Sequence, residues 1–130
     1  MPSKPIQFLS LDEVLAIRER LIDVFGGPAG VRDMGLLESA LYRPQTGYYE
    51  DIHQMSAALF QSLLMNHPFI DGNKRAAFFV TDTFLRLNGF RIEVDSKPAH
   101  EFIIGLLESN KVDFDSLLAW LEVHVRKCVS

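Results

Sequence analysis

The chain has 130 residues, of which 48% are hydrophobic and 23% are charged, and its formal net charge at pH 7 is −4. This length and composition are typical of one globular domain that can bury a hydrophobic core. The negative charge argues against broad binding to nucleic acid or anionic membranes, because both need a basic surface. No stretch approaches the ~20 apolar residues that span a bilayer, and the N-terminus lacks the apolar run of a secretion signal. The single cysteine, Cys128, fits a reducing, cytoplasmic setting.

The first predicted element is a helix that follows Ser10 and stops at Gly26-Gly27. Ser10 and Glu13 have the spacing of a capping box, in which each side chain satisfies a backbone donor of the first turn. Apolar side chains recur on one face of this helix, which predicts that the face packs on the core. These side chains are Val14, Ile17, Leu21, Val24 and Phe25.

A loop rich in turn formers, GGPAGVRDMG, follows, and Asp33 is expected to cap a short helix through residues 36–41. The segment RPQTGYYED breaks the helical pattern, so Tyr48 and Tyr49 fall on a loop or a short extended piece. Apolar residues then return at helical spacing from Ile52 to Leu63. That helix should end at His67, because the following proline disfavours helical geometry there.

The segment KRAAFFVTDTFLRLNG predicts another helix, closed by Asn88-Gly89. Its apolar residues cover most of the circumference, which predicts a place in the middle of a helical bundle. The segment FRIEV alternates and predicts a short strand or extended turn, and two more helices are expected at about 98–108 and 115–127. We find no internal repeat, low-complexity tract or linker. The sequence therefore predicts one compact all-α domain over residues 1–130.

The stretch NHPFIDGNKR joins the two central predicted helices and places Lys74 and Arg75 where a helix begins. Cations there are mildly unfavourable, because aligned peptide dipoles make a helix start positive. Gly72 allows backbone N–H groups to turn toward a ligand, and the first N–H groups of a helix have no partner inside it. These features together suit a bound phosphate.

The neighbouring side chains supply the remaining parts of a phosphoryl- or nucleotidyl-transfer site. Asn73 can add a donor, while Lys74 and Arg75 add charge and a fork of donors. Asp71 suits a magnesium ion, which prefers carboxylate and phosphate oxygens. His67 can accept a proton from an attacking hydroxyl, because imidazole exchanges protons near neutral pH.

Plainer interpretations exist for several of these residues. Asp71 alone can be read as the N-cap of the following helix, Gly72 as a hinge and Asn73 as a turn residue. The remaining histidines have no partner at metal-ligand spacing, so they are expected to lie at the surface or to pack. They are His53, His100 and His124.

The segment HPFIDGNKR resembles the Fic/Doc motif, in which His, Pro and Phe are followed by an acidic residue, Gly, Asn and Arg. Upstream, FGGPAGVRDMGLLESAL is similar to the glycine-rich connection that follows the first helix of Doc toxins, and FLRLNGF is also similar to that group. The resemblance covers residues 10–94 and implies an all-α fold with the motif between two central helices. It implies that His67 is the general base, that Asp71 is the metal ligand and that Phe69 anchors the loop. The implied phosphate-binding residues are Gly72, Asn73, Lys74 and Arg75. Tyr48 and Tyr49 match the substrate-docking flap of the family.

The family divides by the group that it transfers. AMP-transferring Fic enzymes usually carry glycine after the asparagine and a second arginine three residues beyond the first, where this chain has Lys74 and Phe78. Those choices resemble Doc toxins, which transfer the terminal phosphate of ATP to a threonine of elongation factor Tu and stop translation. Gly72, in contrast, is the residue expected in AMP-transferring relatives. AMP transfer to a protein hydroxyl therefore stays an alternative, and a non-catalytic nucleotide-binding or interaction module is a third.

Family members are restrained by an inhibitory helix with Ser or Thr, then Glu four residues later, then Gly or Asn. The nearest match here is Thr46 to Glu50, but Asp51 follows it and the segment is predicted to be a loop. The resemblance to Doc toxins therefore implies restraint by a separate antitoxin chain.

Overall fold

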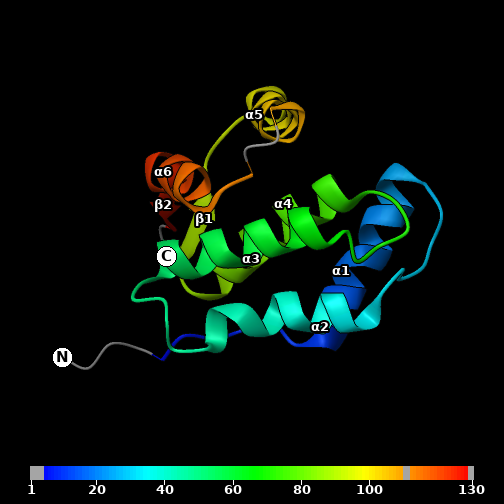
Figure 1. The fold of residues 1–130 in the computed structure, drawn as a ribbon, viewed down its shortest axis with the longest axis horizontal. Helices are drawn as coiled ribbons and strands as arrows, with labels where there is room; N and C mark the ends of the chain where they lie inside the picture. Colours follow the sequence, from blue (N-terminus) through cyan, green and yellow to red (C-terminus); the bar gives the residue numbers. More distant parts are fainter. Residues whose placement is uncertain (1–4, 110–111, 129–130) are drawn as a thin grey trace.

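The computed structural model describes residues 5–109 and 112–128, which form a helical domain with one small two-stranded sheet (Figure 1). The predicted all-α class is confirmed. None of the described helices is long and apolar enough to cross a membrane. In chain order the elements are α1 Leu11–Phe25, α2 Met34–Tyr42, the 3-10 turn η1 Arg43–Gln45, α3 Ile52–Asn66, α4 Asn73–Leu87, β1 Phe90–Ile92, α5 Ser96–Glu108, α6 Phe114–His124 and β2 Val125–Lys127.

Helix α1 begins as the sequence predicts and then departs from the prediction at its end. Glu13 donates its backbone N–H to Ser10 Oγ at 3.2 Å, and Ser10 N–H donates to Glu13 Oε1 at 3.0 Å, which completes the capping box. Hydrogen bonding from the Ser10 backbone N–H, and then from the Ser10 side chain, lowers the pKa of the Glu13 carboxyl. Val24 and Phe25 are not on the core as expected, since they are 70% and 50% exposed. The buried face runs instead through Arg18, because the last turn of α1 extends beyond the core toward the start of α4.

Helices α3 and α4 form the centre of the domain and contribute most of its fully buried large side chains. The predicted place of α4 in the middle of the bundle is confirmed, but not all of its apolar residues are buried, because Phe79 is 37% exposed and Leu87 is also exposed. Phe79 lies instead against Phe25 of α1, with ring centroids 6.2 Å apart. Helix α3 is the more enclosed of the two, and its buried residues are Ile52, Ser56, Ala57, Ala58, Leu59, Phe60, Ser62, Leu63 and Leu64.

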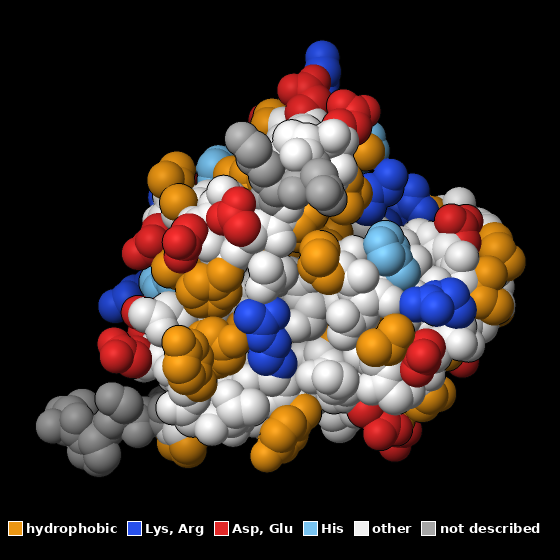
Figure 2. Space-filling view, in the orientation of Figure 1, with side chains coloured by type: hydrophobic (Ala, Val, Ile, Leu, Met, Phe, Trp, Pro, Cys, Tyr) orange, Lys and Arg blue, Asp and Glu red, His pale blue; other side chains and the backbone are white. Residues whose placement is uncertain are grey.

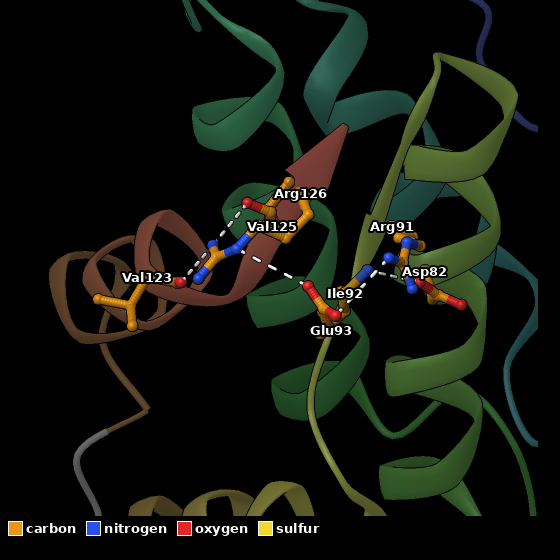
Figure 3. A network of polar contacts seen from close by, with 7 residues as sticks. All are labelled: Asp82, Arg91, Ile92, Glu93, Val123, Val125 and Arg126. Carbon is orange, nitrogen blue, oxygen red and sulfur yellow. Dashed lines mark hydrogen bonds and ion pairs between the residues drawn. The ribbon is translucent and has the colours of Figure 1, made fainter. Parts of the chain in front are cut away.

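The segment FRIEV does contain a strand, and its partner lies where a helix was expected. β1 pairs antiparallel with β2, so the last helix ends at His124 rather than near Lys127. The sheet is fastened to α4 by Asp82, whose Oδ1 accepts the Ile92 N–H at 2.8 Å (Figure 3). Glu93 lies 3.8 Å from Arg126 across the sheet. Pairing with β1 gives backbone groups of β2 their hydrogen-bond partners.

The loop before α2 behaves as predicted, and the loop before α3 supplies a cap that was not predicted. Asp33 caps α2 by accepting the Leu36 N–H at 3.0 Å, and Asp51 caps α3 in the same manner through Gln54. Residues 46–50 form no α-helix, which confirms that they lack the inhibitory helix of the family pattern.

Candidate active site

The motif loop, which we define as residues 67–72, begins with a constrained histidine. His67 ends α3 with φ 46° and ψ 57°, and it is the one non-glycine residue of positive φ in residues 5–109 and 112–128. A residue held in this left-handed region stores strain, which clusters at active sites and ligand clamps. Arg32 fixes the turn from outside, since its Nε donates to the His67 carbonyl and its Nη2 to the Asn66 carbonyl, both at 2.7 Å.

The glycine-rich connection, residues 26–33, runs alongside the motif loop like a short strand. Val31 forms an isolated antiparallel bridge with Phe69, and Arg32 N–H donates to the Pro68 carbonyl at 2.7 Å. Phe69 is only 1% exposed and lies in the core, as expected for a loop anchor. Each of the two segments therefore supplies backbone partners of the other.

Asn73 closes the motif loop through both ends of its side-chain amide. Oδ1 accepts the Phe69 N–H and Nδ2 donates to the Phe69 carbonyl, each at 3.0 Å. The sequence predicted a phosphate donor at this position, and the structure gives the amide a bracing role that the prediction lacked. One amide hydrogen remains for a ligand, because an Asn amide carries two donors.

Gly72 is the N-cap of α4, with φ 69° and ψ 26°, and no side chain caps this end of the helix. The alternative in which Asp71 is the cap is therefore wrong. The first N–H groups of α4 are left for another acceptor, with Lys74 and Arg75 in the same turn. This arrangement suits an anion, as the sequence predicted.

A cleft of about 950 Å³ opens between the motif loop and α5. Six of the predicted site residues line it: His67, Asp71, Gly72, Asn73, Lys74 and Arg75. Its lining carries three Lys or Arg side chains, Lys74, Arg75 and Lys97, against the single carboxylate of Asp71. In the space-filling view, Lys and Arg side chains gather near a histidine between α5 and the right end of the molecule (Figure 2). A chain of negative net charge thus has a locally basic cleft, which raises the local concentration of anionic ligands.

Tyr48 and Tyr49 do not line this cleft. Tyr48 is 81% exposed, and Tyr49 accepts a hydrogen bond from Arg43 Nε at 2.8 Å while packing against Phe114. The two rings meet edge to face. Their assignment as a substrate-docking flap stays a prediction.

Sequence reasoning missed Arg18, which is buried in α1 with 6% of its surface exposed. Its Nη2 donates to the Asp71 carbonyl at 2.6 Å, and its guanidinium carbon lies 5.0 Å from the centroid of the Phe69 ring. Burial lowers the pKa of Arg18, the Asp71 carboxylate raises it and Arg75 lowers it. A signal was present, because an arginine four residues after Val14 falls on the apolar face of the helix.

Three other residues of the cleft were also missed. Phe25 supports a cation, since the Arg75 guanidinium lies 4.1 Å from its ring centroid. Lys97 and His100 line the opposite wall from α5. His100 had been expected at the surface or in packing; it is exposed, on the cleft side of α5. Nothing in the local sequence linked α5 to the motif loop, because the contact is made only by the fold.

The donor set of the cleft fits a magnesium ion that arrives with a nucleotide. Among the described residues, no group of three or more His, Cys, Asp and Glu side chains could enclose a metal. Asp71 offers one exposed carboxylate beside the anion-binding helix start. Magnesium is commonly held in this way, by one or two carboxylates together with substrate phosphates and waters.

Known proteins resemble this chain over most of its length. The sequence pattern of the Fic/DOC family matches residues 8–85. The chain is 41% identical over 103 residues to Toxin Doc of Mycolicibacterium smegmatis, covering 75% of this chain and 79% of that protein. It is 31% identical over 104 residues to Protein kinase doc of Escherichia phage P1, covering 77% of this chain and 82% of that protein.

Proposed function

The chain belongs to the Fic/DOC family, and on that premise we propose that it is a Doc-like toxin kinase. It uses ATP and Mg²⁺ to phosphorylate a hydroxyl of a translation factor, with elongation factor Tu as the acceptor, and so blocks translation. One observation carries this proposal: the cleft gathers His67, the Asp71 carboxylate and the cationic, uncapped start of α4. Phosphoryl transfer depends on positioning and charge neutralisation, and these groups supply both.

Each residue has a distinct part in the proposed reaction. His67 accepts the proton as the acceptor hydroxyl oxygen bonds to the γ-phosphorus; the bond from that phosphorus to the bridging oxygen breaks and ADP leaves. Lys74, Arg75 and the free N–H groups at the start of α4 hold the phosphates. Asp71 would hold magnesium, which when bound neutralises charge on the phosphate oxygens. The fixed backbone at His67 supports its part as the base, since Arg32 donates to the His67 carbonyl and His67 lines the cleft.

Phosphate transfer is favoured over AMP transfer by the residue at position 78. Phe78 lines the cleft where AMP-transferring relatives usually carry a second arginine. A phenyl ring cannot replace a guanidinium fork as a phosphate ligand. The relative named as a protein kinase points to the same reaction.

The decisive experiment supplies purified protein with elongation factor Tu and Mg²⁺, and with ATP labelled at either the γ or the α position. We expect γ-label, and no α-label, to enter the acceptor. Label from the α position would establish AMP transfer instead, and label from neither position would contradict both activities with this acceptor.

A toxin of this type also needs a neutralising partner. The relatives named Doc suggest a cognate antitoxin, and residues 46–50 lack the helix that would restrain the chain from within. We expect expression of the chain alone to arrest growth. Growth that continues with soluble, folded protein present would contradict the toxin assignment.

A further inference from the structure

Gly72 contacts a buried side chain from another helix, and this contact changes how the glycine is interpreted. A Cβ built on Gly72 would lie 2.8 Å from Arg18 Nη1, 3.6 Å from Cζ and 3.7 Å from Nη2. Real Cβ atoms essentially never approach a neighbour as closely as the first of these distances. Any side chain at position 72 therefore requires the guanidinium of Arg18 to move.

Arg18 has little freedom to move. Its guanidinium is planar and rigid, so a shift of Nη1 also shifts Nη2. Nη2 donates to the Asp71 carbonyl at 2.6 Å and to the Pro28 carbonyl at 3.4 Å. The same group lies over the Phe69 ring, with its guanidinium carbon 5.0 Å from the ring centroid. Displacement of the guanidinium would break its hydrogen bond to the Asp71 carbonyl, and the motif loop would lose that support.

We propose that Arg18 is a positioning residue that fixes Asp71 and the start of α4, and that Gly72 is present because Arg18 occupies the space of its side chain. This inference rests on the proposed function, since it concerns the residues assigned to magnesium and phosphate. The guanidinium donates a hydrogen bond to the backbone carbonyl of Asp71, so the Asp71 carboxylate remains available to a ligand in the cleft. It does so from behind the loop, because Arg18 is not among the residues that line the cleft.

The packing explanation removes the one feature of the motif that favoured AMP transfer. Gly72 is the residue expected in AMP-transferring relatives, yet here a local contact accounts for it without any role in choosing the transferred group. The choice then depends on Lys74 and Phe78, which both favour the kinase.

The first test is a double-mutant cycle on thermal stability, with Gly72→Ala and Arg18→Met made singly and together. Alanine at φ 69° is strained in both backgrounds, so the strain cancels and the contact with Arg18 remains. We expect Gly72→Ala to lower Tm by at least about 3 °C more in the wild-type background than in the Arg18→Met background. Equal losses in the two backgrounds would overturn the packing explanation.

The second test measures magnesium dependence, with [γ-32P]ATP and elongation factor Tu as probes. We expect Arg18→Met to raise the Mg²⁺ concentration for half-maximal transfer and to lower the rate roughly 10- to 100-fold, because the Asp71 backbone loses its support. Arg18→Lys should restore part of the activity, since it keeps a charge and one donor, and it serves as the milder variant if Arg18→Met does not fold. The control is Arg20→Met, an exposed arginine on the same helix. An unchanged magnesium requirement in Arg18→Met would overturn the positioning role.

The cycle variants also test the group transferred. In Gly72→Ala with Arg18→Met, the ratio of γ- to α-label in the acceptor should stay that of Arg18→Met alone; a change of this ratio in either direction would show that Gly72 selects the reaction. If the wild type transfers no label, the proposed function fails. The stability cycle and hydrogen exchange of residues 67–73 still decide the inference, since faster exchange in Arg18→Met than in Arg20→Met supports it and equal exchange contradicts it.

Discussion

One wall of the cleft is the motif loop with the start of α4, and the other is the side of α5 that carries Lys97 and His100. The first wall is fixed by directional bonds from several segments, including Arg18 of α1, Arg32 of the glycine-rich connection and Asn73 of α4. In the described part of the chain, no side-chain hydrogen bond or ion pair joins α5 to another helix. α5 packs instead through apolar side chains and through Phe102, which stacks on Trp120 at 4.7 Å. In Figure 1, α5 lies apart from the other helices at the top of the molecule.

This difference matches what each wall is proposed to do. Transfer of a phosphate requires base, metal ligand and phosphate contacts at fixed distances, and a misplacement of ~1 Å costs about 100-fold in rate. Hydrogen bonds give such precision because they depend on both distance and angle. Apolar contacts are non-directional. Helix α5 can therefore add charge and surface to the cleft, but the positions of its side chains are less precisely fixed. Substitutions in the motif-loop wall should therefore reduce activity and stability more than substitutions in the α5 wall.

The largest effect is expected at the base. His67→Asn keeps a residue that tolerates the left-handed conformation and removes the proton acceptor, so phosphate transfer should fall about 100- to 10,000-fold. Tm should change little, because His67 is exposed. His53→Gln, on the same helix and away from the cleft, is the matched control. Transfer by His67→Asn at the wild-type rate would remove the histidine from the mechanism.

The anchor of the same wall should dominate stability. Phe69→Ala removes a ring that is 1% exposed, and such truncations destabilise folded proteins by about 3–5 kcal/mol. The equivalent change on α5, Phe102→Ala, removes a half-buried ring and should cost less than half as much. Urea unfolding of both variants measures the difference. Equal losses would mean that the two walls are fixed equally well.

The sequence predicted the fold class, most helix starts and the place of the motif loop between α3 and α4, because these depend on local chemistry. Capping residues such as Ser10 and Asp33 act within one turn, and the signals of residues 67–75 lie within nine positions. What the sequence could not predict depends on tertiary contact. Nothing local places Lys97 opposite Lys74, and the replacement of a final helical turn by β2 depends on the distant strand β1.

The interpretation of apolar residues failed for the same reason. Val24 and Phe25 continue the apolar face of α1. They are exposed because the last turn of the helix extends beyond the core. Periodicity gives the direction of a side chain and not the presence of a neighbour there. Arg18 shows the converse, since its position on the apolar face was visible and only the structure reveals what it contacts.

A moderate effect is expected where α1 supports Arg75. Phe25→Leu keeps an apolar side chain but removes the ring that lies 4.1 Å from the guanidinium. A cation–π contact at an exposed site contributes about 0.5–1 kcal/mol, so KM for ATP should rise roughly 2- to 5-fold with little change in kcat. Phe25→Tyr keeps an aromatic face and should behave as the wild type. A fall in kcat at constant KM would contradict a role confined to phosphate binding.

The smallest effect is expected on α5. Lys97 lines the cleft as an exposed cation, and no hydrogen bond or ion pair of its side chain is seen in the described residues, so it acts on an anionic ligand chiefly through its field. Lys97→Met should therefore weaken ATP binding only about 2- to 5-fold at low salt. Because salt screens exposed charges beyond a Debye length of about 8 Å at physiological ionic strength, the loss should shrink as salt is added. Lys127→Met, an exposed cation on β2 outside the cleft, is the control for net charge. A loss in Lys97→Met that exceeds ~10-fold and persists at high salt would mean a direct phosphate contact, and α5 would then be as strictly placed as the motif loop.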